Sequence, residues 1–376
     1  MFHRILDLAR LLEKKSFFLF GPRGTGKTTL VKHTLRDITV IDLLDIRTYR
    51  EYLKNPSILS EQVTKPVVVI DEVQKLPEIL DEVHRLIEGK RQRFLLTGSS
   101  ARKLKRGGAN LLAGRAWWAE LFPLTSREIP DFDLLTYLNR GGLPAIYPSD
   151  DYLEELRAYA ALYLKEEIQN EALTRKIAQF SEFLELIALS NGEEISYQSI
   201  ANDCGVSANS IKNYVQILED TLLAFQLKAF TKTRKRKAIS RSKLYLFDIG
   251  VTNSLANRGE IRPVSELFGK AFEHFVILEV RAFLSYARKT VDMYYWRSTS
   301  QFEVDLILGD QWAIEIKGAA SVADKHLKGI RALKEEGKIQ NFAVVSLDQN
   351  ERKTADNITI FPWKTFLKRL WNGELV

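Results

Sequence analysis

Residues 21–28 read GPRGTGKT and match the phosphate-binding pattern G-x-x-x-x-G-K-[ST] at every fixed position. The stretch follows the apolar residues 17–20 and precedes a helix-forming segment, which is the context that this pattern requires. Glycines allow backbone N–H groups to turn onto phosphate oxygens, and the start of a helix attracts negative charge. We expect Lys27 to reach the outer phosphates of a nucleotide and the Thr28 hydroxyl to bind Mg²⁺.

A second pattern, VVVIDE, occupies residues 67–72 and places two carboxylates at the end of an apolar strand. We expect Asp71 to hold the magnesium shell and Glu72 to orient and polarise the attacking water. Either pattern alone is compatible with a structural role, but the two together favour ATP hydrolysis. The predicted nucleotide-binding residues are Gly21, Pro22, Arg23, Gly24, Thr25, Gly26, Lys27, Thr28, Thr29 and Asp71.

Two weaker features accompany these patterns. Residues 94–100 end the next predicted strand with hydroxyl groups, so Thr97 and Ser99 lie where a γ-phosphate sensor is expected. The same hydroxyls could instead cap the following helix. Arg115 follows a Lys/Arg-rich segment. It is either an arginine finger for a neighbouring subunit, which would make hydrolysis depend on oligomerisation, or a solvated or structural residue.

Residues 17–125 alternate short apolar runs with longer amphipathic segments. The runs lie at 17–20, 40–43, 67–70, 94–96 and 117–121. Such runs, separated by helix-length segments, are typical of a buried parallel sheet with helices on both faces. The sequence therefore predicts an α/β fold for this region.

Composition limits the class of protein. The chain has 376 residues, 45% of them hydrophobic and 27% charged, which fits two or three globular domains. One cysteine, Cys204, and five histidines exclude an internal disulfide and disfavour a structural zinc site. No apolar run is long enough to cross a membrane, and the first residues lack signal-peptide features, so we expect a cytoplasmic protein.

The middle of the chain is predicted to be helical, beginning after the breakpoint GGLP at 141–144. Residues 197–203 form a predicted helix, 204–206 a turn, and Ser207 a cap for a second helix. This succession indicates a helix-turn-helix.

A basic segment follows, because no acidic residue lies between Asp220 and Asp248. After a helix-turn-helix it indicates the β-wing of a winged-helix domain, whose lysines and arginines would contact the DNA backbone more than its bases. The alternative is a solvated basic hairpin that never meets nucleic acid. The candidate DNA-binding residues are Lys212, Lys232, Arg234, Lys235, Arg236, Lys237 and Arg241.

A third unit begins after Phe268 and carries a second group of charged residues. Asp305 ends a predicted strand, and Glu315 and Lys317 share one face of the next, while Glu273 lies on a preceding helix. The arrangement resembles the PD-(D/E)XK nuclease pattern. That resemblance implies that Asp305 and Glu315, helped by Glu273, bind a divalent cation, and that Lys317 assists attack on phosphorus. The same residues could be ordinary hairpin charges, or could bind nucleic acid without cleaving it.

The runs GPRGTGKTT, VVIDEVQ, LLTGSSA, LAGRAWWAELFPLTSRE and GGLP resemble a prokaryotic branch of AAA+-type ATPases. The resemblance covers nearly the whole chain. It implies a P-loop AAA+-type domain over residues 1–145, a helical and winged-helix domain over 146–250, and a small α/β PD-(D/E)XK-like domain over 251–376.

These features lead to one principal hypothesis and two rivals. The principal one is an ATP- and Mg²⁺-dependent enzyme that acts on DNA, works as a homo-oligomer such as a hexameric ring, and carries a nuclease centre. Its main rival is a nucleotide-dependent regulatory switch whose C-terminal domain only binds nucleic acid or a partner. A protein-remodelling ATPase is disfavoured because no aromatic pore loop stands out.

Overall fold

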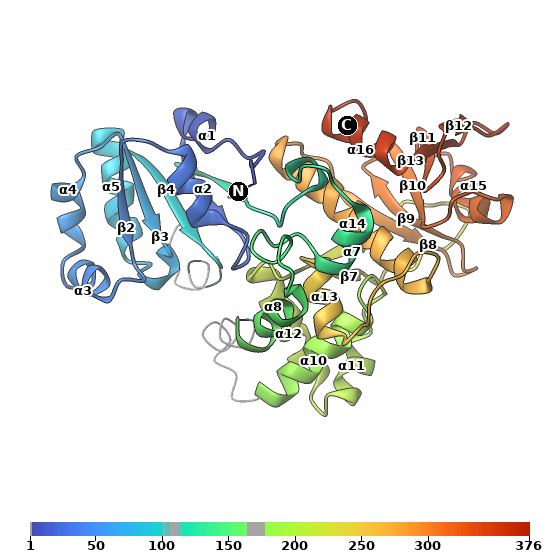
Figure 1. Ribbon diagram of the computed structural model, residues 1–376, viewed down its shortest axis with the longest axis horizontal. Coiled ribbons are helices and arrows are strands. Elements are labelled where there is room, and N and C mark those ends of the chain that lie inside the picture. The colour runs from blue at the N-terminus through green and yellow to red at the C-terminus, as the bar shows by residue number, and fades with distance from the viewer. Residues whose placement is uncertain (1, 101, 103, 105–111, 113, 164–176) are drawn as a thin grey trace.

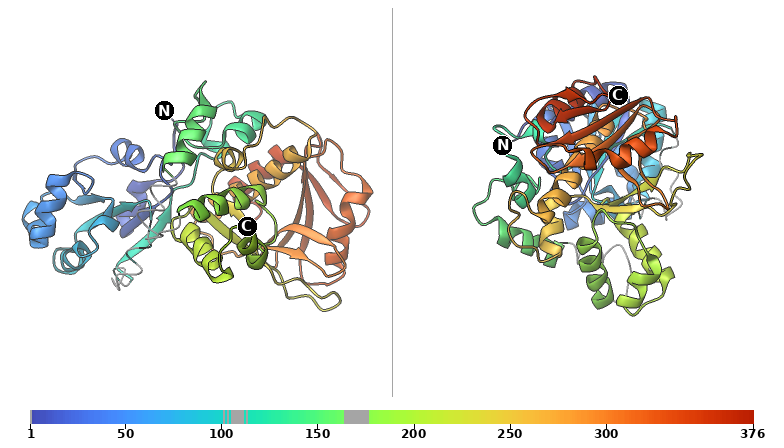
Figure 2. Two further views of the ribbon diagram at one scale, coloured as in Figure 1. Left: turned by 90° about the horizontal axis from the view of Figure 1, so that it is seen from below. Right: turned by 90° about the vertical axis from the view of Figure 1, so that its right-hand side faces the viewer.

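The computed structural model describes residues 2–100, 102, 104, 112, 114–163 and 177–376 (Figure 1). The N-terminal and C-terminal sheets lie at opposite ends of the molecule, with the middle helices between them (Figure 2). No helix in the described part of the chain is both long and apolar enough to span a bilayer.

Five parallel strands form the N-terminal sheet in the order β2-β3-β4-β1-β5. The strands are β1 (Ser16–Phe20), β2 (Ile38–Asp42), β3 (Val67–Asp71), β4 (Arg93–Gly98) and β5 (Ala116–Glu120). Each overlaps one predicted apolar run, so the α/β layout is confirmed. Because all strands run in one direction, the carboxyl ends of β1, β3 and β4 meet at one edge, where ligands bind in sheets of this kind.

Both faces of this sheet are covered, as the apolar runs predict. Phe17 and Leu19 of β1 pack with α1 (Leu8–Lys14) and α2 (Lys27–Thr34). Phe18 and Phe20 alternate with them and face the opposite core. That core is formed with α3 (Ile46–Lys54), α4 (Leu59–Gln62) and α5 (Ile79–Lys90), and the short turns η1 (Pro56–Ile58) and η2 (Val73–Lys75) complete the domain.

The middle of the chain is helical and contains the predicted helix-turn-helix helices. Ser207 accepts a hydrogen bond from the Ser210 N–H and so caps the second of them, as predicted. The elements are η3 (Ser126–Glu128), α7 (Leu134–Arg140), α8 (Tyr152–Ala158), the π-helical turn η4 (Tyr159–Tyr163), α10 (Ile177–Leu189), α11 (Tyr197–Asp203), α12 (Ala208–Asp220) and α13 (Ile249–Leu255).

The predicted wing strands are β6 (Ala224–Ala229) and β7 (Lys243–Leu246), and they pair antiparallel. They do not stand apart as a wing. Strand β6 also pairs with β8 of the C-terminal region, through Lys228↔Tyr294 and Ala229↔Tyr295, so the hairpin is the edge of a larger sheet. A boundary after residue 250 therefore divides strands that share one sheet.

The C-terminal sheet has eight strands in the order β12-β13-β11-β10-β9-β8-β6-β7. A 21-residue helix, α14, packs on one face with α16, and α15 packs on the other. The remaining elements are α14 (Glu266–Tyr286), β8 (Met293–Arg297), β9 (Glu303–Leu308), β10 (Trp312–Lys317), η5 (Asp324–Leu327), α15 (Lys328–Lys334), β11 (Asn341–Ser346), β12 (Arg352–Lys353), β13 (Thr359–Pro362) and α16 (Trp363–Trp371).

Helix α14 connects the two ends of the molecule. Its last residue, Tyr286, accepts a hydrogen bond from Arg4 at 3.2 Å, and Arg281 pairs with Glu120 of β5 at 2.9 Å. Earlier on the helix, the buried Glu279 accepts the Ser126 N–H at 2.6 Å. The helix therefore joins the C-terminal sheet to the edge of the N-terminal one.

Candidate functional site

The phosphate-binding loop connects β1 to α2. Gly24 and Gly26 have φ values of 84° and 91°, in the left-handed region that favours glycine. A side chain at Gly21 would place its Cβ 2.4 Å from the Leu121 carbonyl oxygen, so this position has no room for one. Backbone geometry therefore requires glycine at these three positions, in addition to the close approach of phosphate that the motif implies.

Lys27 is buried at the start of α2, and its ammonium turns back into the loop. The Nζ atom donates to the carbonyl oxygens of Gly21 at 2.6 Å and Pro22 at 3.1 Å. The loop thus holds a positive charge at the N-terminus of a helix, where phosphate oxygens bind favourably.

Asp71 is the centre of a line of hydrogen bonds across three elements. Its Oδ2 accepts the Thr28 hydroxyl of α2 at 3.1 Å, and its Oδ1 accepts the Thr97 hydroxyl of β4. The structure therefore brings together three residues predicted from separate motifs. The Thr28 and Asp71 oxygens are ligands of the kind that Mg²⁺ prefers.

Glu72 lies next to this line in a left-handed conformation, with φ 58°. Gln74 Nε2 donates to Glu72 Oε2 at 2.5 Å and to Ser99 Oγ at 3.1 Å, so Gln74 joins the predicted base to the predicted sensor. Gln74 was not predicted, although it stands in the VVIDEVQ run. The hydroxyl of the neighbouring Ser100 accepts the Arg102 N–H at 3.1 Å.

Arg115 pairs with Glu88 of α5 in its own chain. The guanidinium lowers the pKa of the Glu88 carboxyl through a hydrogen bond and its charge. This partner fits the structural interpretation of Arg115, and the arginine-finger interpretation stays a prediction.

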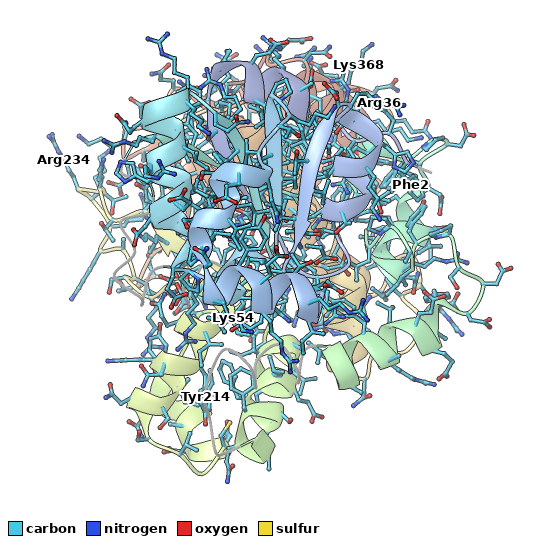
Figure 3. The ribbon with its side chains drawn as sticks, turned by 90° about the vertical axis from the view of Figure 1, so that its left-hand side faces the viewer. Phe2, Arg36, Lys54, Tyr214, Arg234 and Lys368 are labelled. Carbon is cyan, nitrogen blue, oxygen red and sulfur yellow. The ribbon has the colours of Figure 1, made fainter. Side chains whose placement is uncertain are left out.

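A cavity of about 1130 Å³ opens above the loop. Besides the motif residues, including Thr29, its walls include the N-terminal segment Phe2–Arg4, Pro144 at the end of GGLP, and Pro148. Figure 3 labels Phe2 beside the N-terminal domain. Sequence reasoning missed these walls, because only the tertiary fold brings them to the loop.

Two side chains from outside the motif hold the loop itself. Arg4 Nη1 donates to the Thr25 carbonyl at 2.7 Å, and Tyr159 Oη donates to the Arg23 carbonyl at 2.7 Å. The nucleotide cavity therefore lies between the N-terminal sheet and the middle helices.

The second candidate centre lies on the C-terminal sheet. Lys317 Nζ lies 2.6 Å from Glu315 Oε1 and 3.6 Å from Asp305 Oδ2, so the three residues meet as the pattern predicts. Asp305 also accepts the Ile316 N–H at 2.7 Å. Burial and the Asp305 charge raise the pKa of Glu315 above its usual range.

Glu273, the fourth predicted residue, has other partners. Its Oε1 accepts Tyr245 Oη at 2.6 Å and lies 3.4 Å from Lys243 Nζ, which lies 2.6 Å from Glu303 Oε1. Lys243 is 4% exposed, so this member of the basic segment is an interior residue. Burial raises the pKa of Glu273.

Glu273, Glu303, Asp305 and Glu315 form an acidic cluster. Its carboxylates suit a hard divalent cation only in part. Asp305 and Glu315 offer oxygen ligands, and the buried Glu315 Oε2 has no hydrogen-bond partner among the described residues. However, no group of three His, Cys, Asp or Glu side chains close enough to hold a metal ion occurs among the described residues. The ammonium groups of Lys243 and Lys317 lie against the carboxylates instead.

The lysines and arginines of the basic segment are exposed, with the exception of Arg236 and Lys243. Lys232, Arg234, Lys235, Lys237 and Arg241 face solvent, and Figure 3 labels Arg234 at the edge of the molecule. Lys212 on α12 is also exposed, 5.9 Å from the Tyr197 ring. Apart from the interior Lys243, the exception is Arg236, which pairs with Glu335 at 2.7 Å, while Glu336 accepts the backbone N–H groups of residues 234–236.

Comparison with known families divides the chain into three. Residues 13–130 match an AAA domain, residues 131–262 match a domain of unknown function, DUF8612, and residues 268–366 match a second one, DUF4143. The N-terminal unit is therefore an AAA-type P-loop domain.

The relatives are themselves uncharacterised. An uncharacterised Mycobacterium tuberculosis protein is 23% identical over 72% of this chain, and the chain spans 62% of that relative. Two Methanocaldococcus jannaschii proteins are 29% identical over 50% of this chain and 46% of theirs, and 23% identical over 94% and 85%.

Solved structures resemble the chain only distantly. The replication initiator DnaA bound to AMPPCP and single-stranded DNA is 14% identical, covers 56% of this chain and 85% of its own, and has a TM-score of 0.30. Drosophila ORC bound to AT-rich DNA and Cdc6 is 10% identical, covers 65% and 86%, and has a TM-score of 0.24.

Proposed function

We propose that this protein is an ATP-hydrolysing enzyme that acts on DNA and carries a magnesium-dependent nuclease centre in its C-terminal domain. The observation that carries the first part is the line of hydrogen bonds from Thr28 through Asp71 to Thr97 beside the P-loop. Three sequence-distant motifs meet there at the end of a parallel sheet, next to a cavity large enough for a nucleotide.

The residues have separate roles in the proposed hydrolysis. Lys27 binds the outer phosphates, and Thr28 with Asp71 holds Mg²⁺, which neutralises phosphate charge when bound. Glu72 accepts a proton from the attacking water, and Gln74 orients Glu72 by a 2.5 Å hydrogen bond. The cavity walls from the middle region suggest that nucleotide binding alters how that region packs on the N-terminal domain.

The proposed DNA contacts come from the exposed part of the basic segment and from Lys212. In the C-terminal cluster, Asp305 and Glu315 would hold a divalent cation that polarises a phosphodiester. Lys317 would stabilise the negative charge that develops on phosphate oxygens as water displaces a sugar oxygen from phosphorus. Homo-oligomerisation, with Arg115 acting on a neighbouring subunit, belongs to the same proposal.

One observation favours the rival function, a regulatory switch. The ammonium groups of Lys243 and Lys317 already lie against the carboxylates that a cation would use. A cluster neutralised in this way suits a recognition or structural role as well as a catalytic one.

A single assay separates the two functions. The full chain would be incubated at low salt with single-stranded, duplex and branched DNA in Mg²⁺ or Mn²⁺, with and without ATP. Cleavage that disappears in Asp305→Ala would support the nuclease, and the Lys27→Ala variant would show whether ATP drives it. Binding without cleavage would favour a DNA-gripping ATPase, and no salt-sensitive binding would favour the switch.

A further inference from the structure

Two carbonyl groups of the P-loop are held by side chains from outside the motif. Tyr159 Oη, in the turn η4, donates to the Arg23 carbonyl at 2.7 Å, and Arg4 Nη1 donates to the Thr25 carbonyl at 2.7 Å. Neither donor lies within residues 13–130, which match the AAA domain. The loop is therefore held by parts of the chain that the nucleotide-binding motif does not include.

The direction of a carbonyl group determines the direction of the next N–H group. In a trans peptide, the C=O of one residue and the N–H of the following residue point in opposite directions. The N–H of Gly24 therefore points away from Tyr159, and the N–H of Gly26 points away from Arg4. Both glycines line the nucleotide cavity, and no backbone carbonyl of the described residues accepts either N–H. The two N–H groups are thus available to phosphate oxygens.

Both donors are themselves fixed by surrounding residues. Arg4 Nε pairs with the buried Glu128 at 3.0 Å. Its Nη2 donates to the Phe122 carbonyl at 2.6 Å and to Tyr286 Oη at 3.2 Å. Tyr159 is 5% exposed and packs in the core of the middle helices. Donors held in this way restrict the rotation of the peptide groups that they contact, so the loop needs less ordering when phosphate binds.

We propose that Arg4 and Tyr159 are positioning residues for phosphate binding, because they fix two peptide groups of the P-loop so that the N–H groups of Gly24 and Gly26 face a triphosphate. The inference rests on the proposed nucleotide site, and it adds residues outside the motif that set the affinity of that site. Tyr159 comes from the middle helices, and Arg4 is hydrogen-bonded to the last residue of α14. Loss of either contact would weaken nucleotide binding, so the middle and C-terminal regions influence the P-loop.

The first test compares two tyrosine variants of the full chain by titration with a fluorescent ATP analogue in Mg²⁺. Tyr159→Phe removes only the hydroxyl that holds the Arg23 carbonyl and should raise the dissociation constant about fivefold. Tyr137→Phe is the matched control, because Tyr137 is also buried and its hydroxyl donates at 2.7 Å to the Leu124 carbonyl, outside the P-loop. It should lose a similar free energy of unfolding in urea and keep the parental affinity. Equal affinities of the two variants would overturn the proposal.

Competition by inorganic tripolyphosphate isolates the phosphate contacts, because this ligand has no base or sugar. Tyr159→Phe should weaken tripolyphosphate binding about as much as binding of the ATP analogue, and a loss confined to the ATP analogue would refute the positioning role. Arg4→Lys is an independent variant. It keeps a positive charge beside Glu128 but lacks the guanidinium fork that reaches Thr25 and Phe122 together, so it should also bind about fivefold more weakly. Parental affinity in Arg4→Lys would remove Arg4 from the proposal.

These measurements read binding and need neither hydrolysis nor DNA. Weaker binding by Tyr159→Phe, in a chain whose parent binds ATP without hydrolysing it, would support the positioning role and overturn the proposed function alone. Parental binding by Tyr159→Phe, in a chain that hydrolyses ATP, would overturn the positioning role alone. A parent that binds no nucleotide would overturn both.

Discussion

The backbone N–H of Gly142 donates a 2.7 Å hydrogen bond to Asp248 Oδ2, and this bond joins the turn beside the P-loop to the chain that leaves strand β7. Gly141, the preceding residue, has φ 73°, and a Cβ there would lie 2.2 Å from Asp248 Oδ1. Gly141 is therefore required for close approach of a buried carboxylate, whereas a Cβ on Gly142 would lie 2.6 Å from the Leu124 carbonyl oxygen. Burial raises the pKa of Asp248 to about 6 despite three backbone donors.

Replacing this carboxylate should weaken the whole molecule. Asp248→Ala leaves the Gly142 and Val251 N–H groups without their acceptor, at a cost of about 2–4 kcal/mol in the free energy of unfolding. Urea unfolding measures the change. Asp150→Ala, an exposed aspartate near the same turn, is the matched control and should be close to neutral. Equal free energies of unfolding for the two variants would show that the hydrogen bond between Gly142 and Asp248 does not stabilise the protein.

Glu72 should contribute to hydrolysis and not to nucleotide affinity. Glu72→Gln should lower the rate of ATP hydrolysis about 100-fold or more, because general-base catalysis contributes factors of that size. Binding of a fluorescent ATP analogue should change little. The exposed Glu78→Gln serves as control. Hydrolysis by Glu72→Gln at the parental rate would remove Glu72 from the mechanism.

Gln74 depends on the glycine that ends β4. In Gly98→Ala, the new Cβ would lie 2.3 Å from Gln74 Oε1 and 3.0 Å from the Phe20 ring, so Gln74 must move away from Glu72. We expect the ATPase rate to fall about tenfold through misplacement of the base. Gly89→Ala, at an exposed position of α5 where no described residue lies within 4 Å of the new Cβ, should leave the rate unchanged. A parental rate in Gly98→Ala would show that this contact is dispensable.

Glu279 should make stability depend on pH. Burial raises its pKa from 4.5 to about 7, so the folded protein binds its proton more tightly than the unfolded chain does. The stabilisation is complete below pH 4.5 and is lost as the pH rises through about 7. Relative to Glu279→Gln, the free energy of unfolding of the parent should therefore fall by about 3 kcal/mol between pH 4.5 and 8. Denaturant titrations across this range measure the difference, and a constant difference would contradict the assignment.

Arg115 is either an arginine finger for a neighbouring subunit or a structural residue, and the two roles predict different kinetics. If it acts on a neighbouring subunit, ATPase activity per molecule should rise steeply with protein concentration, and Arg115→Ala should abolish that rise. Glu88→Gln, which removes only the ion pair of Arg115 within its own chain, should keep it. A flat specific activity, or equal effects of the two variants, would assign Arg115 a structural role.

Local sequence patterns predicted the site residues whose positions depend on motif spacing and on the order of neighbouring strands. The residues of the P-loop, Asp71 and Glu72 follow from motif spacing, and the sheet that brings Thr97 to Asp71 follows from the apolar runs. Asp305, Glu315 and Lys317 lie on two neighbouring antiparallel strands, so their meeting also follows from short-range order.

The contacts that the sequence did not reveal are long-range. Tyr159 reaches the P-loop from 136 residues away, and Arg4 reaches Glu128 from 124. Counting charges along the basic segment could not separate the exposed Lys232 from the interior Lys243, because the distinction arises only when β7 pairs within the sheet and meets α14. The pairing of β6 with β8 makes the expected wing the edge of the C-terminal sheet.

Phosphate release from ATP by the purified full chain in Mg²⁺, with and without duplex DNA, tests whether this protein is a DNA-stimulated ATPase. We expect steady hydrolysis that DNA stimulates and that Lys27→Ala abolishes. A parental rate no higher than that of Lys27→Ala, in the presence and absence of DNA, would contradict this expectation.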